Sequence, residues 1–372
     1  MRAALRALHA WTGAACGLVL AVIGLSGALL VFEDDYLRAT LPGADAPVTT
    51  DPVALGALLE RLEAGPRGAP LHVVFGDAGM ALHTVQFARS AGAYVDSEGA
   101  AVVAWREPVR VEQRLFRLHH SLFAGEAGER ISGWAALLAV ALAASGAVLW
   151  WPARRAFRPR AWPVSRRRRD VLAQHRDLGA IFALPLVVLA LTGAALHFPA
   201  EAQRLLAVVM PEPPAPSAAE LAPAPAAMAR PGDVDWPAAL MHAQARFPDA
   251  QLRIVTWPAR PGEPATVRLR RVGEWHANGR TLVRLDPATG RVLATVDALA
   301  LPRAERFFHT LWPVHAAKLG GRAVDLLTCA SGLALALLGS LASWAFVGRR
   351  LPSRLRQVPF GADPPAGRTL GP

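Results

Sequence analysis

The chain has 372 residues, of which 53% are hydrophobic and 31 are prolines, and its mean hydropathy is +0.26. It is too apolar for a soluble enzyme and too rich in proline to be helical throughout, so the composition indicates membrane helices together with a second kind of structure. The formal net charge of +11 would suggest a nucleic-acid partner in a soluble protein. The main arginine run, 166–169, has no interleaved aromatic residues for base stacking, which argues against nucleic acid.

Four apolar stretches are long enough to cross a lipid bilayer, which takes about 20 residues of helix. The first resembles a cleaved signal peptide, but the same pattern recurs later in the chain, so we interpret it as a retained span. The predicted order is spanning helix 1–32, module 33–130, spanning helix 131–152, basic loop 153–172, spanning helix 173–198, module 199–322 with a Pro/Ala linker at 211–227, spanning helix 323–347 and tail 348–372.

The distribution of arginine predicts the orientation. The segment 152–170 holds eight arginines and one acidic residue, so the positive-inside rule places it in the cytoplasm. Arg2 and Arg6 precede the first span and the basic segment 348–357 follows the last, so both termini are expected on the same side. The two modules are then expected in the periplasm, and the protein in a bacterial inner membrane.

Each module is expected to place one helix on a small antiparallel sheet, because leucine-rich helical spacing is followed by short β-type stretches and turns. Cys16 and Cys329 both fall within spans, so neither a disulfide framework nor a CxxC site is expected. The predicted module elements are a helix at 51–65 with strands at 71–75, 81–87 and 101–105, and a helix at 235–247 with strands at 251–257, 265–272, 281–285 and 291–296.

Two alignments indicate an internal repeat. The first sets the start of the first span over the start of the third at a constant offset of 166, which pairs His9 with His175. The second sets the approach to the second span over the approach to the fourth at an offset of 195, which pairs His120 with His315. The fold class expected is therefore a membrane α-helical bundle of four spans, made of two parallel repeats whose equivalent positions face each other, with two small α+β modules outside.

Four motifs carry a resemblance to a known family: 8-LHAWTG-13, 174-QHRDLG-179, 285-LDPATGRVL-293 and 313-PVHAAKLGG-321. Together with the spans, they resemble the PepSY-associated transmembrane-helix family over about residues 1–350. That resemblance implies PepSY-like modules outside the membrane. It also implies a relation to iron-regulated inner-membrane proteins and ferric-siderophore reductases, which look like di-haem b-type cytochromes.

A haem that is not covalently attached needs an imidazole on each face of its iron and small residues that let the porphyrin approach a helix. We expect such a site between His9 and His175. Each of these histidines is followed by glycines four and eighteen residues later, on the same helix face. The alternative is that the glycines pack helices together and that the histidines reach the headgroups. The glycines are Gly13 and Gly27 in the first copy, and Gly179 and Gly193 in the second.

A second haem is expected at the outer face between His120 and His315, each of which is followed five residues later by glycine. The alternative is a pair of surface histidines in glycine-rich turns. His197 is a competing outer ligand, although Val31 occupies its repeat position; it lies about 33 Å along a helix from His175, so these two cannot serve one haem. His119 and His309 are further candidate ligands. We interpret His72, His83, His242 and His276 as module residues without a ligand role.

The absence of a CxxCH motif makes any haem b-type, and two are expected. Zinc is set aside because HExxH and clustered carboxylates are lacking, and no GxGxxG motif is present, so electrons must come from a cytoplasmic reductase or a quinol. The sequence thus predicts an oxidoreductase that conducts electrons across the membrane. The resemblance implies that its acceptor is a ferric siderophore. The competing class is a haem-free membrane sensor or assembly protein whose modules bind a peptide or protein, with a transporter third.

Overall fold

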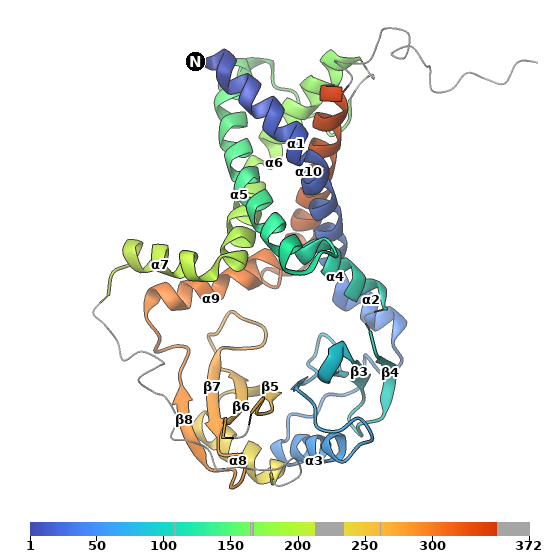
Figure 1. The fold of residues 1–372 in the computed structure, drawn as a ribbon, viewed down its shortest axis with the longest axis vertical. Helices are drawn as coiled ribbons and strands as arrows, with labels where there is room; N and C mark the ends of the chain where they lie inside the picture. Colours follow the sequence, from blue (N-terminus) through green and yellow to red (C-terminus); the bar gives the residue numbers. More distant parts are fainter. Residues whose placement is uncertain (108, 164, 166, 213–233, 261, 348–372) are drawn as a thin grey trace, which may run out of the picture.

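The computed structural model describes the chain except residues 108, 164, 166, 213–233, 261 and 348–372. The expected tail, and all but the first two residues of the expected Pro/Ala linker, lie outside the described residues. The described part is a bundle of long helices joined at one end to a domain built on a β-sheet (Figure 1). We call the latter the extramembrane domain, comprising the described residues of 41–110 and 234–302.

Four helices are long and apolar enough to cross a membrane, which agrees with the predicted spans. Each begins a few residues before its apolar run, because the glycine and charged residues there fall outside the hydropathy pattern but still continue the helix. The helices are α1 (Arg2–Leu30), α5 (Gly125–Trp150), α6 (Arg168–His197) and α10 (Gly321–Val347), and a 3-10 turn, Trp151–Ala156, follows α5.

Helices α1 and α10 approach each other closely because glycines face glycines. A Cβ added to Gly339 would lie 2.1 Å from the carbonyl oxygen of Gly17. One added to Gly332 would lie 2.5 Å from the carbonyl oxygen of Gly24. Small residues at these positions let the two backbones touch, as is common for packed membrane helices. Helix α5 packs against α6. The bundle therefore consists of two helix pairs, α1 with α10 and α5 with α6.

Four shorter helices lie between the bundle and the extramembrane domain (Figure 1). The sequence patterns above did not predict them, because they are amphipathic and short rather than continuously apolar. They are α2 (Glu33–Thr40), α4 (Val111–Ser121), α7 (Pro199–Val209) and α9 (Arg303–His315).

The chain reverses sharply after α4 and after α9. Leu122 and Phe123 have φ values of 50° and 60°, and Ala317 and Gly320 have φ values of 57° and 97°. Residues other than glycine rarely adopt this left-handed conformation, so the surrounding structure must enforce these turns. Because of the reversals, the ends of α4 and α9 lie beside the bundle rather than extending away from it along the axes of α5 and α10.

One antiparallel sheet of eight strands runs through the extramembrane domain, in the order β4-β3-β2-β1-β5-β6-β7-β8. The two halves of the chain meet at its centre, where Val73 of β1 pairs with Val255 of β5. The strands are β1 (His72–Val74), β2 (His83–Gln86), β3 (Gly92–Val95), β4 (Ala101–Trp105), β5 (Gln251–Thr256), β6 (Ala265–Arg270), β7 (Thr281–Leu285) and β8 (Val292–Val296), with a 3-10 turn at Ala88–Ser90.

This continuous sheet corrects the expectation of two separate modules. A four-stranded sheet in each half would leave β1 and β5 as open edges with unpaired N–H and C=O groups, and pairing the two edges satisfies both. Seven of the eight strands coincide with predicted ones. The strand β3, sequence Gly-Ala-Tyr-Val, was missed because its small residues carry little β pattern.

Helices α3 (Pro52–Glu63) and α8 (Trp236–Arg246) cover the face of the sheet that points away from the bundle (Figure 1). Asp51 and Asp235 cap them by accepting hydrogen bonds from backbone N–H groups three residues later. The core of the domain lies between these helices and the sheet; its fully buried members include Leu55, Leu59, Val73, Val85, Trp236, Leu240, Val255, Val267 and Val283. The opposite face of the sheet is turned toward the bundle.

Candidate functional site

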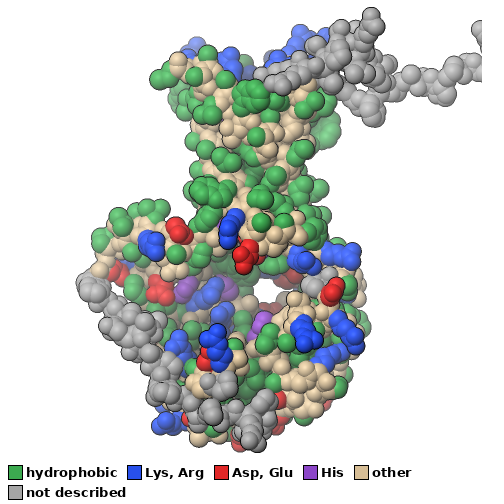
Figure 2. All heavy atoms as spheres, in the orientation of Figure 1, with side chains coloured by type: hydrophobic (Ala, Val, Ile, Leu, Met, Phe, Trp, Pro, Cys, Tyr) green, Lys and Arg blue, Asp and Glu red, His purple; other side chains and the backbone are tan. Residues whose placement is uncertain are grey.

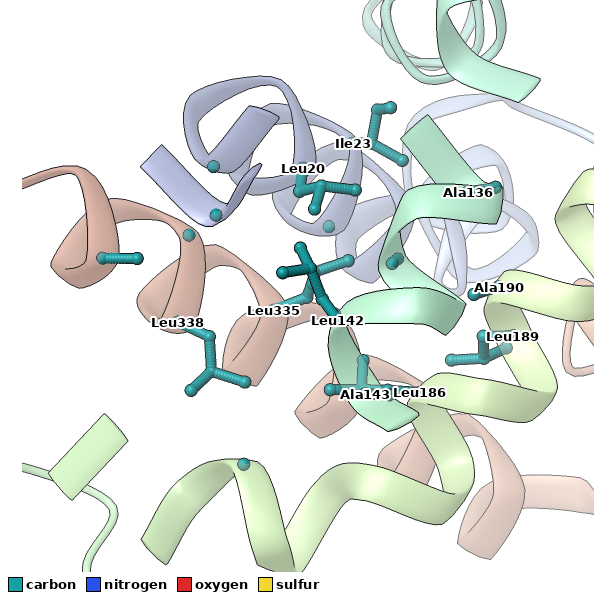
Figure 3. A pocket seen from close by; sticks show the side chains of 18 of the residues that line it. Leu20, Ile23, Ala136, Leu142, Ala143, Leu186, Leu189, Ala190, Leu335 and Leu338 are labelled. Atoms are coloured by element: carbon teal, nitrogen blue, oxygen red, sulfur yellow. The ribbon is translucent and has the colours of Figure 1, made fainter. Parts of the chain in front are cut away.

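A cavity of about 680 Å³ runs along the inside of the helix bundle. Its middle is lined by leucine, isoleucine and alanine side chains from α1, α5, α6 and α10 (Figure 3). A volume of this size is within the range of small-molecule and cofactor sites, roughly 300–1,000 Å³. The polar groups of the cavity are concentrated at its ends, and five of them are histidines. The histidines that line it are His9, His119, His175, His197 and His315.

At the arginine-rich end of the bundle, His9 of α1 faces His175 of α6. The centroids of the two imidazole rings are 6.3 Å apart, and the ring planes make an angle of 79°. Nδ1 of His9 is 2.9 Å from Oγ of Ser145, which lies on α5. The backbone of Leu338 on α10 lies beside the His175 ring, although Nδ1 of His175 forms no hydrogen bond of ordinary geometry.

At the other end of the cavity, His119 of α4 faces His315 of α9. Their ring centroids are 6.0 Å apart, at an interplanar angle of 45°. Nδ1 of His119 is 2.9 Å from the carbonyl oxygen of Ile23, and Nδ1 of His315 is 3.0 Å from that of Leu189. Ile23 and Leu189 are 166 residues apart, the offset of the first alignment, so the two histidines occupy matching environments.

Glycines position the imidazole rings of His119 and His315. A Cβ on Gly27 would come within 2.8 Å of Cε1 of His119, and a Cβ on Gly193 within 3.0 Å of Cε1 of His315. Hydroxyl groups of the preceding residues add a second contact, because Ser26 Oγ lies 3.4 Å from Nδ1 of His119 and Thr192 makes the corresponding contact at 3.0 Å. The glycines Gly27 and Gly193, expected to face a porphyrin, therefore support the outer histidines directly.

The structure corrects the register of the second alignment. His119, and not His120, lies opposite His315, and the offset that relates them is 196 rather than 195. At this offset Gly125 matches Gly321, and both have positive φ at the start of a span. The sequence was ambiguous because the histidine is doubled in one copy and the glycine in the other.

His120 belongs to a different cluster at the same end of the bundle. Its ring stacks on Phe116, with centroids 5.3 Å apart, and lies 5.1 Å from the ring of His197. Its Nδ1 is 3.6 Å from a carboxylate oxygen of Glu129, and the His120 side chain is 42% exposed. His120 and His197, expected as alternative outer ligands, therefore meet each other beside the His119–His315 pair.

Gly13 and Gly179 lie one turn inside the bundle from His9 and His175, and both line the cavity. The nearest atom to a Cβ at either position would be 3.9 Å away, on a leucine side chain. Unlike Gly27 and Gly193, these glycines thus leave open space next to their histidine pair.

The two pairs have the spacing that a shared metal ion would need. With metal–nitrogen bonds of about 2 Å, an ion held between two imidazoles puts the ring centroids roughly 6 Å apart. Hydrogen bonds at Nδ1 of His9, His119 and His315 leave Nε2 as the free ligand atom. The residues present therefore fit a bis-histidine haem at each end.

A family model described as the PepSY-associated TM region matches residues 6–349. The chain belongs to this family. As a member of the PepSY-associated TM family with four apolar spans, it is a multi-pass membrane protein whose helices contact the lipid bilayer. No curated protein matches the chain.

Proposed function

We propose that this PepSY-associated membrane protein is a b-type cytochrome that carries electrons across a bacterial inner membrane and reduces a ferric siderophore in the periplasm. One observation carries the proposal: four histidines meet in two facing pairs, 6.3 and 6.0 Å between ring centroids, at opposite ends of one apolar cavity. A single accidental meeting of two histidines is ordinary, but two facing pairs at similar spacing in one apolar cavity indicate a common function.

His9 and His175 would hold the inner haem, and His119 and His315 the outer one. A bound haem b supplies a reversible one-electron couple. The backbone carbonyls of Ile23 and Leu189 fix the orientation of the outer imidazoles, and a hydrogen-bonded Nδ1–H makes Nε2 more basic. The apolar side chains between the two sites keep water and protons out of the cavity.

The two sites lie at different depths in the membrane. His9 and Gly27, against which His119 packs, are eighteen residues apart on α1, or about 27 Å along the helix. This is close to the thickness of the hydrocarbon core, about 30 Å. The bundle is therefore long enough to link one membrane surface to the other.

The proposed orientation follows from the arginine distribution, with the segment 152–170 in the cytoplasm and the extramembrane domain in the periplasm. The electron donor belongs to the quinol or the flavin-reductase class and acts at the His9–His175 end. Each ferric ion takes up one electron, and the ferrous ion leaves because hard oxygen chelators hold it less tightly. Reporter fusions at residues 160 and 290 should report opposite sides of the membrane.

The test is electron transfer from the reduced protein to a ferric chelate. Protein purified after expression with added haem is reduced with stoichiometric dithionite and mixed with ferric citrate, while a ferrous-specific dye traps the product. We expect reoxidation of the haem bands together with ferrous iron in a one-to-one ratio, and at least a hundredfold slower transfer in His315→Ala. Haem-loaded, reduced protein that fails to reduce any ferric chelate would refute the proposal.

A further inference from the structure

A second cavity, of about 490 Å³, lies in the extramembrane domain beside α9. Its walls come from α9 and from the loop between β6 and β7, residues 271–280. We call it the α9 cavity. Figure 2 shows an opening between the end of the bundle and the extramembrane domain, with arginine or lysine and histidine side chains along its margin. The charged and polar residues that line the α9 cavity are Glu274, His276, Arg280, Arg303, Arg306, His309 and Thr310.

Arg280 is the central cation of this cavity, and its guanidinium lacks an acidic partner among the described residues. Its Nε is buried without a hydrogen bond. One terminal nitrogen lies 3.1 Å from Nε2 of His276, but Nδ1 of the same ring already accepts from the N–H of Asn278. A neutral imidazole can accept at only one of its nitrogens, so His276 cannot satisfy both donors.

Other charges around Arg280 add to its positive field. Arg268 on β6 is partly buried nearby and forms no ion pair within the described part of the chain; burial, followed by repulsion from Arg268, lowers the pKa of Arg280 to about 10. Burial and the same two arginines lower the pKa of His309 to about 4. The lining carboxylate, Glu274, is occupied by the backbone N–H groups of Arg271 and Arg280 and by the Thr281 hydroxyl.

A partly buried guanidinium whose Nε is buried without an acceptor is costly unless an anion completes its hydrogen bonds. The position of the cavity suggests which anion. The ring of His276 stacks on Trp312 with centroids 4.6 Å apart, and Trp312 also lines the bundle cavity, one helical turn before His315. A ligand in the α9 cavity would therefore lie near the proposed outer haem site, separated from it by the stacked rings of His276 and Trp312.

We propose that the α9 cavity binds an anionic ferric chelate, a carboxylate complex whose negative charge pairs with Arg280 and is also attracted by Arg268 behind the cavity wall. The identity of this ligand as the electron acceptor rests on the proposed function, but its binding needs no haem. The cavity thus discriminates by charge, favouring chelates with free carboxylates over neutral hydroxamate complexes. A phosphate group on an anionic lipid shares this chemistry, and the experiment separates the two sources.

The probe is gallium(III) citrate, a redox-inert anion, titrated into the full-length protein in a zwitterionic detergent by calorimetry. We expect saturable binding that weakens at least tenfold in Arg280→Gln and in Arg268→Gln. Arg246→Gln, which removes an exposed charge from α8 on the far face of the sheet, should bind within twofold of the unchanged protein. An unchanged far-UV circular dichroism spectrum and thermal midpoint in both test variants would show that they are folded.

The controls distinguish this inference from the proposed function. His315→Ala should still bind gallium citrate with the original affinity, so a failure of electron transfer leaves the binding result standing. Equal binding of neutral gallium trihydroxamate would overturn the charge assignment. Binding of dihexanoyl phosphatidylglycerol that depends on Arg280, without any binding of gallium citrate, would assign the cavity to lipid instead and overturn the inference.

Discussion

The imidazole of His119 lies against the bare backbone of Gly27, where a Cβ would come within 2.8 Å of Cε1. Gly27→Ala should therefore push the ring away from His315 and empty the outer site. Alanine is a better helix former than glycine, so α1 itself should not be weakened. We expect the haem content to fall from two to one per chain, with the inner haem in the same molecule serving as the control. Two haems with unchanged midpoint potentials would show that the contact is unimportant.

Adjacent histidines offer a matched pair of substitutions. His119→Ala and His315→Ala should each remove the outer haem, because each takes away one of two facing imidazoles. His120→Ala should leave both haems in place, since His120 stacks on Phe116 outside the pair. Pyridine haemochrome analysis of the three variants measures the number of haems per chain directly. Loss of a haem in His120→Ala, with retention in His119→Ala, would reverse the assignment.

The spans and the inner pair could be predicted from sequence because both depend on local patterns. Apolar runs of spanning length identify the four helices, and one offset places His9 opposite His175. The outer pair could not be assigned in the same way. His119 reaches the bundle only because the chain reverses at Leu122 and Phe123, residues whose types give no sign of positive φ.

The amphipathic spacing of α4 and α9 is a further signal in the sequence that indicates where the outer histidines lie. Leu115 and Leu118 in α4, and Leu311 and Val314 in α9, recur at helical intervals just before the outer histidines. Treated as helices, these segments would have placed His119 and His315 at matching ends. The pairing of β1 with β5 could not be predicted in this way, because nothing in either strand specifies its partner across so long a sequence separation.

The contact between α1 and α10 should be intolerant of even a methyl group. In Gly339→Ala the new Cβ would meet the backbone of Gly17 at 2.1 Å, and neither helix can yield without separating. We expect a loss of about 1–3 kcal/mol in stability, measured as a lower thermal midpoint in detergent. Gly13→Ala, whose Cβ has room, should not lower the midpoint. Equal midpoints for the two variants would contradict the close packing.

Acid should destabilise the extramembrane domain through His83. Burial lowers the pKa of this histidine to about 4, and its Nδ1 accepts a hydrogen bond from Gly76 at 3.1 Å. The unfolded chain takes up the proton near pH 6.5, so the contribution of His83 is complete above that pH and is lost as the pH falls through 4. The resulting decrease in the free energy of unfolding is on the order of 3 kcal/mol.

His83→Gln removes this titration while keeping a polar side chain. The decrease in thermal midpoint between pH 7.5 and pH 4.5 should therefore be smaller in the variant than in the unchanged protein. His276 and His309 titrate in both proteins. Parallel decreases would mean that His83 does not supply the pH dependence.

The most direct test of the account is the haem-to-protein ratio of the purified, full-length protein after expression with ample haem. The paired histidines predict two b-type haems per chain, both low-spin, and none in the double variant His119→Ala/His175→Ala, which breaks one ligand pair at each end of the cavity. A protein that folds, remains in the membrane and shows no Soret band would contradict it.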